Sequence, residues 1–177
     1  MTAPIDTRMR LNIGLTAHRD LVAAEEPDLR VIVREFLQNL RAQFPSLPLR
    51  LISALAEGGD QLVAEEALAL GIELMVPLPM PQAEYERDFA DAQVLARFRR
   101  LLAQAQVRVL PLAAGNTADA IATRGPARNR QYAQLGMFVS SHCQLLLALW
   151  DGQPSSATGG TAQVVDVMSP ATTVTSP

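Results

Sequence analysis

Three turns that combine glycine with polar side chains follow apolar stretches of this chain, and their residue types suit the binding of an anion. Glycine lets a backbone turn sharply enough for its amides to approach a phosphate, and a guanidinium binds two phosphate oxygens at once. The turns supply these candidate ligand contacts: Gly14, Thr16, His18, Arg19, Ser53, Glu57, Gly58, Gly59, Asp60, Asp151, Gly159, Gly160 and Thr161. The pattern predicts a site for a phosphate-bearing ligand of nucleotide size.

The second turn carries the clearest local signal: a strand, a glycine pair and a helix in succession. The apolar run 49–56 predicts a buried strand, and four apolar side chains recur at helical spacing over 62–70. Asp60 is placed to cap this helix through its carboxylate, which we favour over a contact with ribose. In an open parallel sheet such a helix N-terminus binds phosphates, because it offers unpaired amides and partial positive charge.

Several of these side chains have a plain structural explanation beside the functional one. His18 could face a phosphate or act as an acid, or it could be an ordinary loop histidine. Arg19 is the better phosphate ligand, and its alternative is a surface ion pair with Asp20 or Glu25. Glu57 could point into the site, although solvent is slightly favoured.

Four side chains outside the turns complete the candidate set, namely Arg87, Arg128, Tyr132 and Trp150. Arg87 could cover a base, although a charged first helical turn explains its segment better. Arg128 belongs to an arginine cluster over 124–130 that is either a mobile lid over phosphates or a solvated helix start. Tyr132 is expected in the core or the site wall. Trp150 could stack on a base, but packing is the commoner role.

Apolar strands alternate with helices along the whole chain. Strands are expected at 9–16, 49–56, 72–77, 106–112 and 144–150. Helices are expected at 27–44, 60–70, 82–90, 91–105, 128–142 and 159–168, with a flexible loop over 113–126. This order predicts a doubly wound α/β fold with a mainly parallel sheet of about five strands between two helical layers. The domain should span 9–168, after an N-terminal arm at 1–8 and before a disordered tail at 169–177.

Length and composition narrow the class of protein. A chain of 177 residues, 49% hydrophobic, is long enough for one domain with a sizeable core. Its net charge is -3 and it has no long basic run, which argues against a duplex nucleic-acid partner. Cys143 is the single cysteine, and no spacing of ligand residues suggests a metal. No apolar run could span a membrane, so we expect a soluble cytoplasmic protein without a membrane partner.

The three turns resemble those of a known superfamily. Ser53-Ala-Leu-Ala-Glu-Gly-Gly-Asp60 is similar to the turn of the DNA-processing protein A fold. Gly-Leu-Thr-Ala-His-Arg at 14–19 and Gly-Gly-Thr at 159–161 look like the other signature turns of the SLOG superfamily. The resemblance covers roughly 9–168. It implies a Rossmann-like three-layer fold that binds nucleotides or nucleotide-derived signals at this edge, and it implies a homodimer.

One departure from the superfamily bears on activity. The LOG enzymes, which hydrolyse nucleoside 5'-monophosphates, carry a glutamate where this chain has Val164 beside Gln163. A neutral amide cannot act as a general base, so a ligand-binding or sensing domain is favoured over a LOG-like hydrolase, and no catalytic residue is assigned. No cofactor is expected. The DNA-processing relatives bind single strands through basic surfaces, and the acidic balance argues against that partner here. A separate effector protein stays an open alternative.

Overall fold

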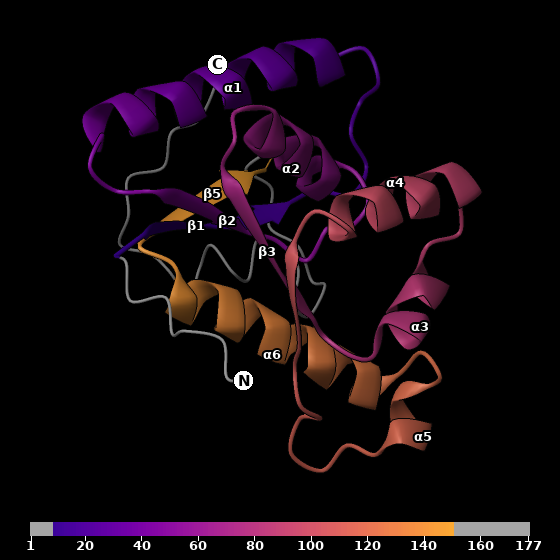
Figure 1. The fold of residues 1–177 in the computed structure, drawn as a ribbon. Helices are drawn as coiled ribbons and strands as arrows, with labels where there is room; N and C mark the ends of the chain where they lie inside the picture. Colours follow the sequence, from indigo (N-terminus) through magenta and orange to yellow (C-terminus); the bar gives the residue numbers. More distant parts are fainter. Residues whose placement is uncertain (1–8, 151–177) are drawn as a thin grey trace.

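The computed structural model of this chain describes residues 9–150 (Figure 1). The expected N-terminal arm, the third glycine turn with its four candidate contacts, the final helix and the tail lie outside the described residues. Among the helices of the described part, none is long and apolar enough to cross a membrane.

Five parallel strands form one sheet in the order β4-β3-β2-β1-β5. They are β1 (Leu11–Ala17), β2 (Leu49–Ile52), β3 (Glu73–Leu78), β4 (Gln106–Val109) and β5 (Leu145–Leu149). The predicted fold class is confirmed. β2 ends at Ile52, earlier than its apolar run, and Leu55 then takes a left-handed backbone conformation, at φ 57°. β4 also ends early, shortly before Pro111, which has no amide to donate to a sheet.

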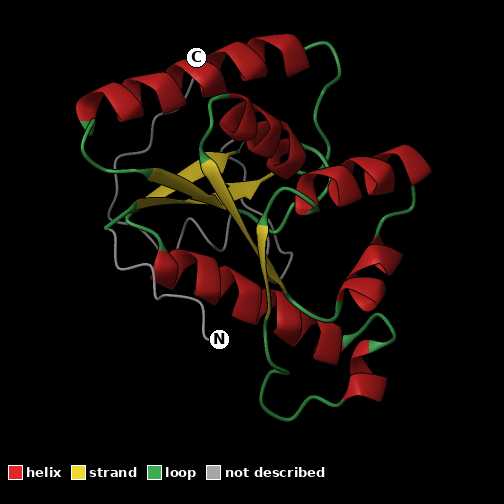
Figure 2. Ribbon diagram, viewed as in Figure 1, coloured by secondary structure: helices red, strands yellow, loops and turns green. Residues whose placement is uncertain are grey.

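Helices cover both faces of the sheet (Figure 2). The helices α1 (Glu26–Gln43), α2 (Gly59–Ala69) and α4 (Ala92–Leu102) lie on one face, and α6 (Pro126–His142) lies on the other. The expected helix 82–90 is divided into α3 (Gln82–Tyr85) and the short 3-10 helix η1 (Glu86–Asp88). Asp91 then caps α4, because its carboxylate accepts the amides of Gln93 and Val94. The expected loop 113–126 contains the short helix α5 (Ala118–Ile121).

The core is densest around α2, which is buried on nearly every side between α1, α4 and the sheet. α1 is an outer helix, and only part of its expected apolar stripe is buried. Val33, Leu37 and Leu40 are covered, whereas Ile32 is 55% exposed. The stripe on α1 is therefore wider than the surface that its neighbours cover.

The order of the strands determines where a ligand site can form. From β1 to β4 the chain moves steadily across the sheet, and α6 then returns over the opposite face to place β5 beside β1. Such a reversal leaves a crevice beyond the carboxyl ends of the central strands. Gly14 lies inside β1, where an added Cβ would be 2.7 Å from the Cys143 sulfur and 2.9 Å from Val139. Its position lets α6 pack closely on the sheet.

Candidate functional site

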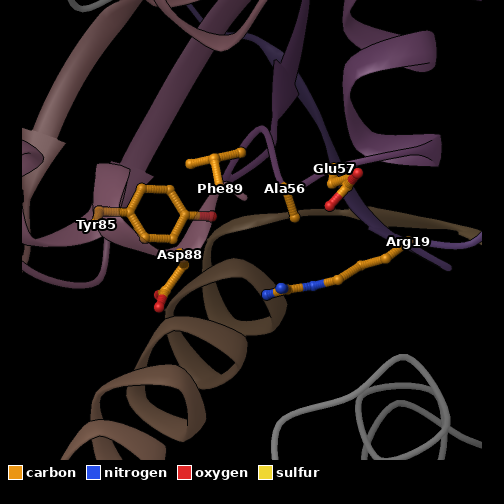
Figure 3. Close-up of a pocket in the computed structure, with 6 residues that line it drawn as sticks. All are labelled: Arg19, Ala56, Glu57, Tyr85, Asp88 and Phe89. Atoms are coloured by element: carbon orange, nitrogen blue, oxygen red, sulfur yellow. The ribbon is translucent and has the colours of Figure 1, made fainter. Parts of the chain in front are cut away.

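A small hollow lies at the carboxyl edge of the sheet (Figure 3). Its lining residues follow three different strands: Arg19 after β1, Ala56 and Glu57 after β2, and Tyr85, Asp88 and Phe89 after β3. The space measures about 190 Å³ with its open mouth included, and its interior has no room for a water-sized sphere, so it is a shallow depression rather than an enclosed pocket.

The first and second glycine turns are in direct contact. The Gly59 amide donates a hydrogen bond to the His18 carbonyl at 3.0 Å. Gly58 has φ +80°, and an added Cβ there would lie 2.0 Å from the Arg19 carbonyl oxygen. Glycine is therefore required at position 58 for its backbone conformation and for the close approach of the first turn. The Gly59 amide is occupied by this contact and does not face the hollow as a free donor.

Asp60 does not cap α2, so that prediction is wrong. The N-cap is Gly58, and the Asp60 side chain points instead into the protein, where the residue is 5% exposed. The Ser53 hydroxyl donates to its carboxylate at 2.7 Å and accepts the Leu55 amide at 3.0 Å. Burial raises the pKa of Asp60 to about 6, and the hydrogen bond from Ser53 offsets only part of this increase. Ser53 and Asp60 thus hold the turn beneath the hollow.

Aromatic rings form the wall of the hollow beside β3. Tyr85 is buried, and its hydroxyl donates to the Ala54 carbonyl at 3.2 Å. Its ring meets the rings of Phe89 and Phe98 edge to face, with centroids 5.5 and 5.7 Å apart. Burial raises the pKa of Tyr85 well above its ordinary value, so the hydroxyl stays protonated. This wall is rigid and neutral.

Arg128 is buried at the side of the hollow, where it joins four segments of the chain. Its guanidinium donates to the Asp88 carboxylate at 2.8 Å and to the carbonyls of Ile121 and Glu84 at 2.6 and 2.8 Å. The Tyr132 hydroxyl donates to the same Asp88 oxygen. Burial acts to lower the pKa of Arg128, but the contacts with Asp88 outweigh it and raise that pKa. Arg128 is fully engaged by protein groups in this structure.

Arg19 is the cation that extends over the hollow, towards Asp88 (Figure 3). Its side chain is exposed. Within residues 9–150 no hydrogen bond or ion pair of its guanidinium is found, including the alternatives with Asp20 and Glu25. The guanidinium is thus presented to the hollow without a protein carboxylate bound to it.

Four other candidates, described next, do not line the hollow. Arg87 is exposed and pairs with Glu84 at 2.9 Å. Thr16 and His18 are partly buried at the end of β1, and Trp150 follows β5. The described part of the chain contains no group of metal-ligating side chains. Phe89 and Asp88 were not among the predicted contacts. The signal that could have indicated them is their position directly after the third strand.

The buried carboxyl of Asp60 makes stability depend on pH. Its pKa is about 6 in the folded chain and about 3.9 unfolded, so protonation favours folding. The stabilisation is complete below about pH 4 and is lost as pH rises through 6. Asp60→Asn removes this titration. We expect the free energy of unfolding of the variant, relative to the parent chain, to be about 1 kcal/mol higher at pH 8 than at pH 5. Urea denaturation at both values measures this, and an equal effect at both would contradict it.

Comparisons with known proteins support the fold. No family model matches the chain, and no curated protein matches it. Among solved structures it is similar to DNA processing protein A from Streptococcus pneumoniae, with a TM-score of 0.54 and 11% identity over 84% of this chain. The chain spans 44% of that protein, which is less than half its length. A second neighbour, DNA processing protein A from Helicobacter pylori, has a TM-score of 0.34 and 15% identity, covering 90% of this chain and 73% of that one.

These neighbours correct the expectation about partners. The Helicobacter pylori protein binds single-stranded DNA. Excluding nucleic acid as a partner on the basis of net charge was therefore wrong. The physical reason is that net charge averages over the chain: residues 92–150 contain seven arginines and only one acidic residue, Asp119. A chain with a negative total can still carry a basic surface.

Proposed function

We propose that this protein binds nucleotides through the hollow at the carboxyl edge, with Arg19 as the phosphate ligand. The observation that carries the proposal is the Arg19 guanidinium, which extends over the hollow and makes no hydrogen bond or ion pair with a carboxylate within residues 9–150. Burial raises the pKa of the nearby Asp60, and the charge of Arg19 offsets part of that increase. A guanidinium in such a position can bind two phosphate oxygens. The place of the hollow, beyond the carboxyl ends of parallel strands, supports the proposal because ligands of this fold class bind there.

The acidic residues of the hollow suit the sugar of the same ligand. Asp88 is neutralised by its contact with Arg128, so it does not repel a phosphate. Glu57 also lines the hollow, and its carboxylate can accept hydrogen bonds from ribose hydroxyls. The hollow is too shallow to enclose the ligand, so the nucleotide lies across its mouth, with the phosphate at Arg19 and the base over the rim formed by Phe89.

A hydrolase of nucleoside 5'-monophosphates is the second candidate, favoured by the position of Glu57 beside Arg19 in the hollow. A carboxylate there could act as general base by taking a proton from the water that attacks the anomeric carbon of the sugar, while the C–N bond breaks and the nucleobase leaves with a proton. Incubation with AMP separates the two functions: release of free adenine that Glu57→Gln abolishes would establish hydrolysis. Binding without release supports the binding function alone.

Replacing Arg19 with glutamine tests the proposed phosphate contact. We expect a 10- to 100-fold weaker Kd for AMP or ADP-ribose by calorimetry, because a hydrogen-bonded charge pair contributes roughly 1.5–3 kcal/mol. Thermal shift should report the same loss as a smaller rise in Tm. The matched control is Arg41→Gln on α1, which removes an exposed arginine bonded to the Leu70 carbonyl and should leave Kd unchanged. Equal affinity of Arg19→Gln and the parent chain would refute the assignment.

A further inference from the structure

The outer edge of the sheet at β4 has no neighbouring strand within residues 9–150. β4 is the last strand in the order of the sheet, and it pairs with β3 alone. All four of its residues are exposed, including Val107 at 46% and Val109 at 50%. Proteins usually protect such an edge with charged side chains or a cover, because open backbone groups invite pairing with another strand. Two exposed valines indicate instead that this edge is covered by something.

The hydrogen bonds to β3 determine which backbone groups of β4 face outward. The Leu110 amide donates to the Leu78 carbonyl at 2.9 Å. In a parallel ladder alternate residues direct both backbone groups to the same neighbour, so those of Arg108 also point to β3. The amides and carbonyls of Val107 and Val109 therefore point away from the sheet. They offer two donors and two acceptors to a further strand.

The two faces of this edge differ in chemistry. Arg108 lies on the face that carries α6, where its guanidinium is 5.4 Å from the centre of the Phe138 ring. Successive side chains of a strand alternate between faces, so Val107 and Val109 lie on the face that carries α4. In the described part of the chain no ion pair of Arg108 is found. A strand that fits this edge has two apolar residues opposite the valines and an acidic residue between them.

That pattern occurs once in the parts of the chain outside the described residues. Among residues 1–8 and 151–177, the one acidic residue between two large apolar neighbours is Asp166, in Val165-Asp166-Val167. Valine is branched at Cβ, which favours strands and weakens helices. The segment 164–168 therefore suits a strand better than the helix expected over 159–168.

We propose that residues 164–168 pair with the outer edge of β4 in the antiparallel direction. Asp166 lies opposite Arg108, and the valines on either side of it each exchange backbone hydrogen bonds with a valine of β4. Opposite charges thus meet on one face, in the closely spaced kind of pair, while the valines of both strands cover each other on the other face. The opposed pairs are Val165–Val109, Asp166–Arg108 and Val167–Val107.

The length of chain after β5 allows this connection. β5 lies at the opposite edge of the sheet, so the new position is about 24 Å away at a spacing of about 4.8 Å per strand. Residues 150–164 can span up to about 50 Å when extended. β5 ends at the carboxyl edge, so a chain that crosses along this edge enters beside the end of β4 and runs antiparallel to it. Tethering raises the effective concentration, so a short pairing suffices.

Two other arrangements fit less well. The edge at β5 consists of uncharged residues only, Leu145–Leu149, and would leave Asp166 without a cation. A second copy of β4, in the antiparallel register that pairs both valines, would place two Arg108 side chains opposite each other. Neither Arg19 nor the hollow takes part in the pairing, so the inference does not depend on the nucleotide function proposed above.

Hydrogen exchange of the Val107 and Val109 amides in the full chain tests the pairing. We expect slow exchange at both positions, because each amide is bonded to the added strand. Val167→Pro removes a donor to β4 and should accelerate this exchange by about tenfold, the value of one lost hydrogen bond. Val164→Pro is the matched control, since the amide at 164 points away from β4 in this register, and it should leave the exchange slow. Fast exchange of both amides in the parent chain would overturn the proposal.

A charge exchange tests the register. Asp166→Arg and Arg108→Asp should each accelerate exchange at the two valines, because like charges then lie opposite each other. The double variant restores the opposite charges and should restore slow exchange. Acceleration in both single variants without recovery in the double variant would show that the two side chains are not partners. Unchanged melting curves establish that faster exchange does not come from global unfolding.

Disulfide trapping identifies the edge and the chain that supplies the strand. In a Cys143→Ser background, Arg108→Cys with Asp166→Cys should form a disulfide within one chain, because the Cα atoms of such a pair are about 4.5 Å apart. Arg108→Cys with Ala162→Cys is the control and should remain reduced. A bond formed only between two chains would overturn the assignment. So would equally ready trapping of Asp166→Cys by Leu147→Cys, which would place the segment on β5.

Discussion

Replacing Gly58 with alanine is expected to lower the free energy of unfolding by about 3–5 kcal/mol. Position 58 has φ +80° and ψ -121°, a conformation that L side chains rarely adopt. The added Cβ would also lie 2.0 Å from the Arg19 carbonyl oxygen, which is backbone and cannot rotate away. The first turn must shift, so binding at the hollow should weaken together with stability.

Gly71→Ala provides the matched control for this prediction. Gly71 has a similar φ of +72°, but nothing lies within 4 Å of the position where its Cβ would be. It should lose about 1–2 kcal/mol through backbone conformation alone. Chemical denaturation of both variants measures the two losses, and similar values would show that the contact between the first two turns does not restrict position 58.

Replacing Arg128 with methionine is expected to destabilise the protein by about 3–5 kcal/mol, although the new side chain keeps an apolar stem in place of the arginine stem. The substitution leaves the Asp88 carboxylate, the Glu84 carbonyl and the Ile121 carbonyl without the guanidinium that they share. The loss of a partner from a buried ion pair leaves the remaining charge uncompensated. The effect should appear as a lower denaturation midpoint with an unchanged dependence on urea.

Two further variants separate the buried pair from ordinary surface charge. Arg87→Gln breaks the exposed pair with Glu84 and should change stability by about 0.5 kcal/mol or less. Asp88→Asn combined with Arg128→Met should lose less than the sum of the single variants, because no charge is left without a partner. If Arg128→Met were as stable as Arg87→Gln, the structural role of Arg128 would be refuted, and the lid interpretation of its arginine cluster would gain support.

Much of the fold could be predicted from the sequence because its signals are local. Continuous apolar runs of strand length alternate with helical periods, and this order indicates a parallel sheet wherever the crossovers are right-handed. The observed strands begin within about two residues of the expected ones. Their ends were less accurate, because an apolar pattern does not show where the backbone leaves the strand: the run 49–56 continues through Leu55, whose backbone is left-handed.

The candidate site was predictable only in part. The sequence placed the candidates Arg19 and Glu57 after the first two strands, and parallel topology brings such positions to one edge. It could not indicate which side chain meets which. The Asp88–Arg128 contact joins residues forty apart in the chain.

The sequence by itself determined the alternation of strands and helices and the need for glycine in the second turn, because periodicity and backbone freedom are properties of short segments. The tertiary structure alone decided the roles of the polar side chains: Asp60 turned inward, Arg128 buried and Arg19 presented to the hollow. Those roles depend on the charge, donors and space that distant segments provide. Total charge was misleading for the same reason, since only folding decides which arginines meet carboxylates, as Arg97 does, and which meet neutral groups, as Arg130 does.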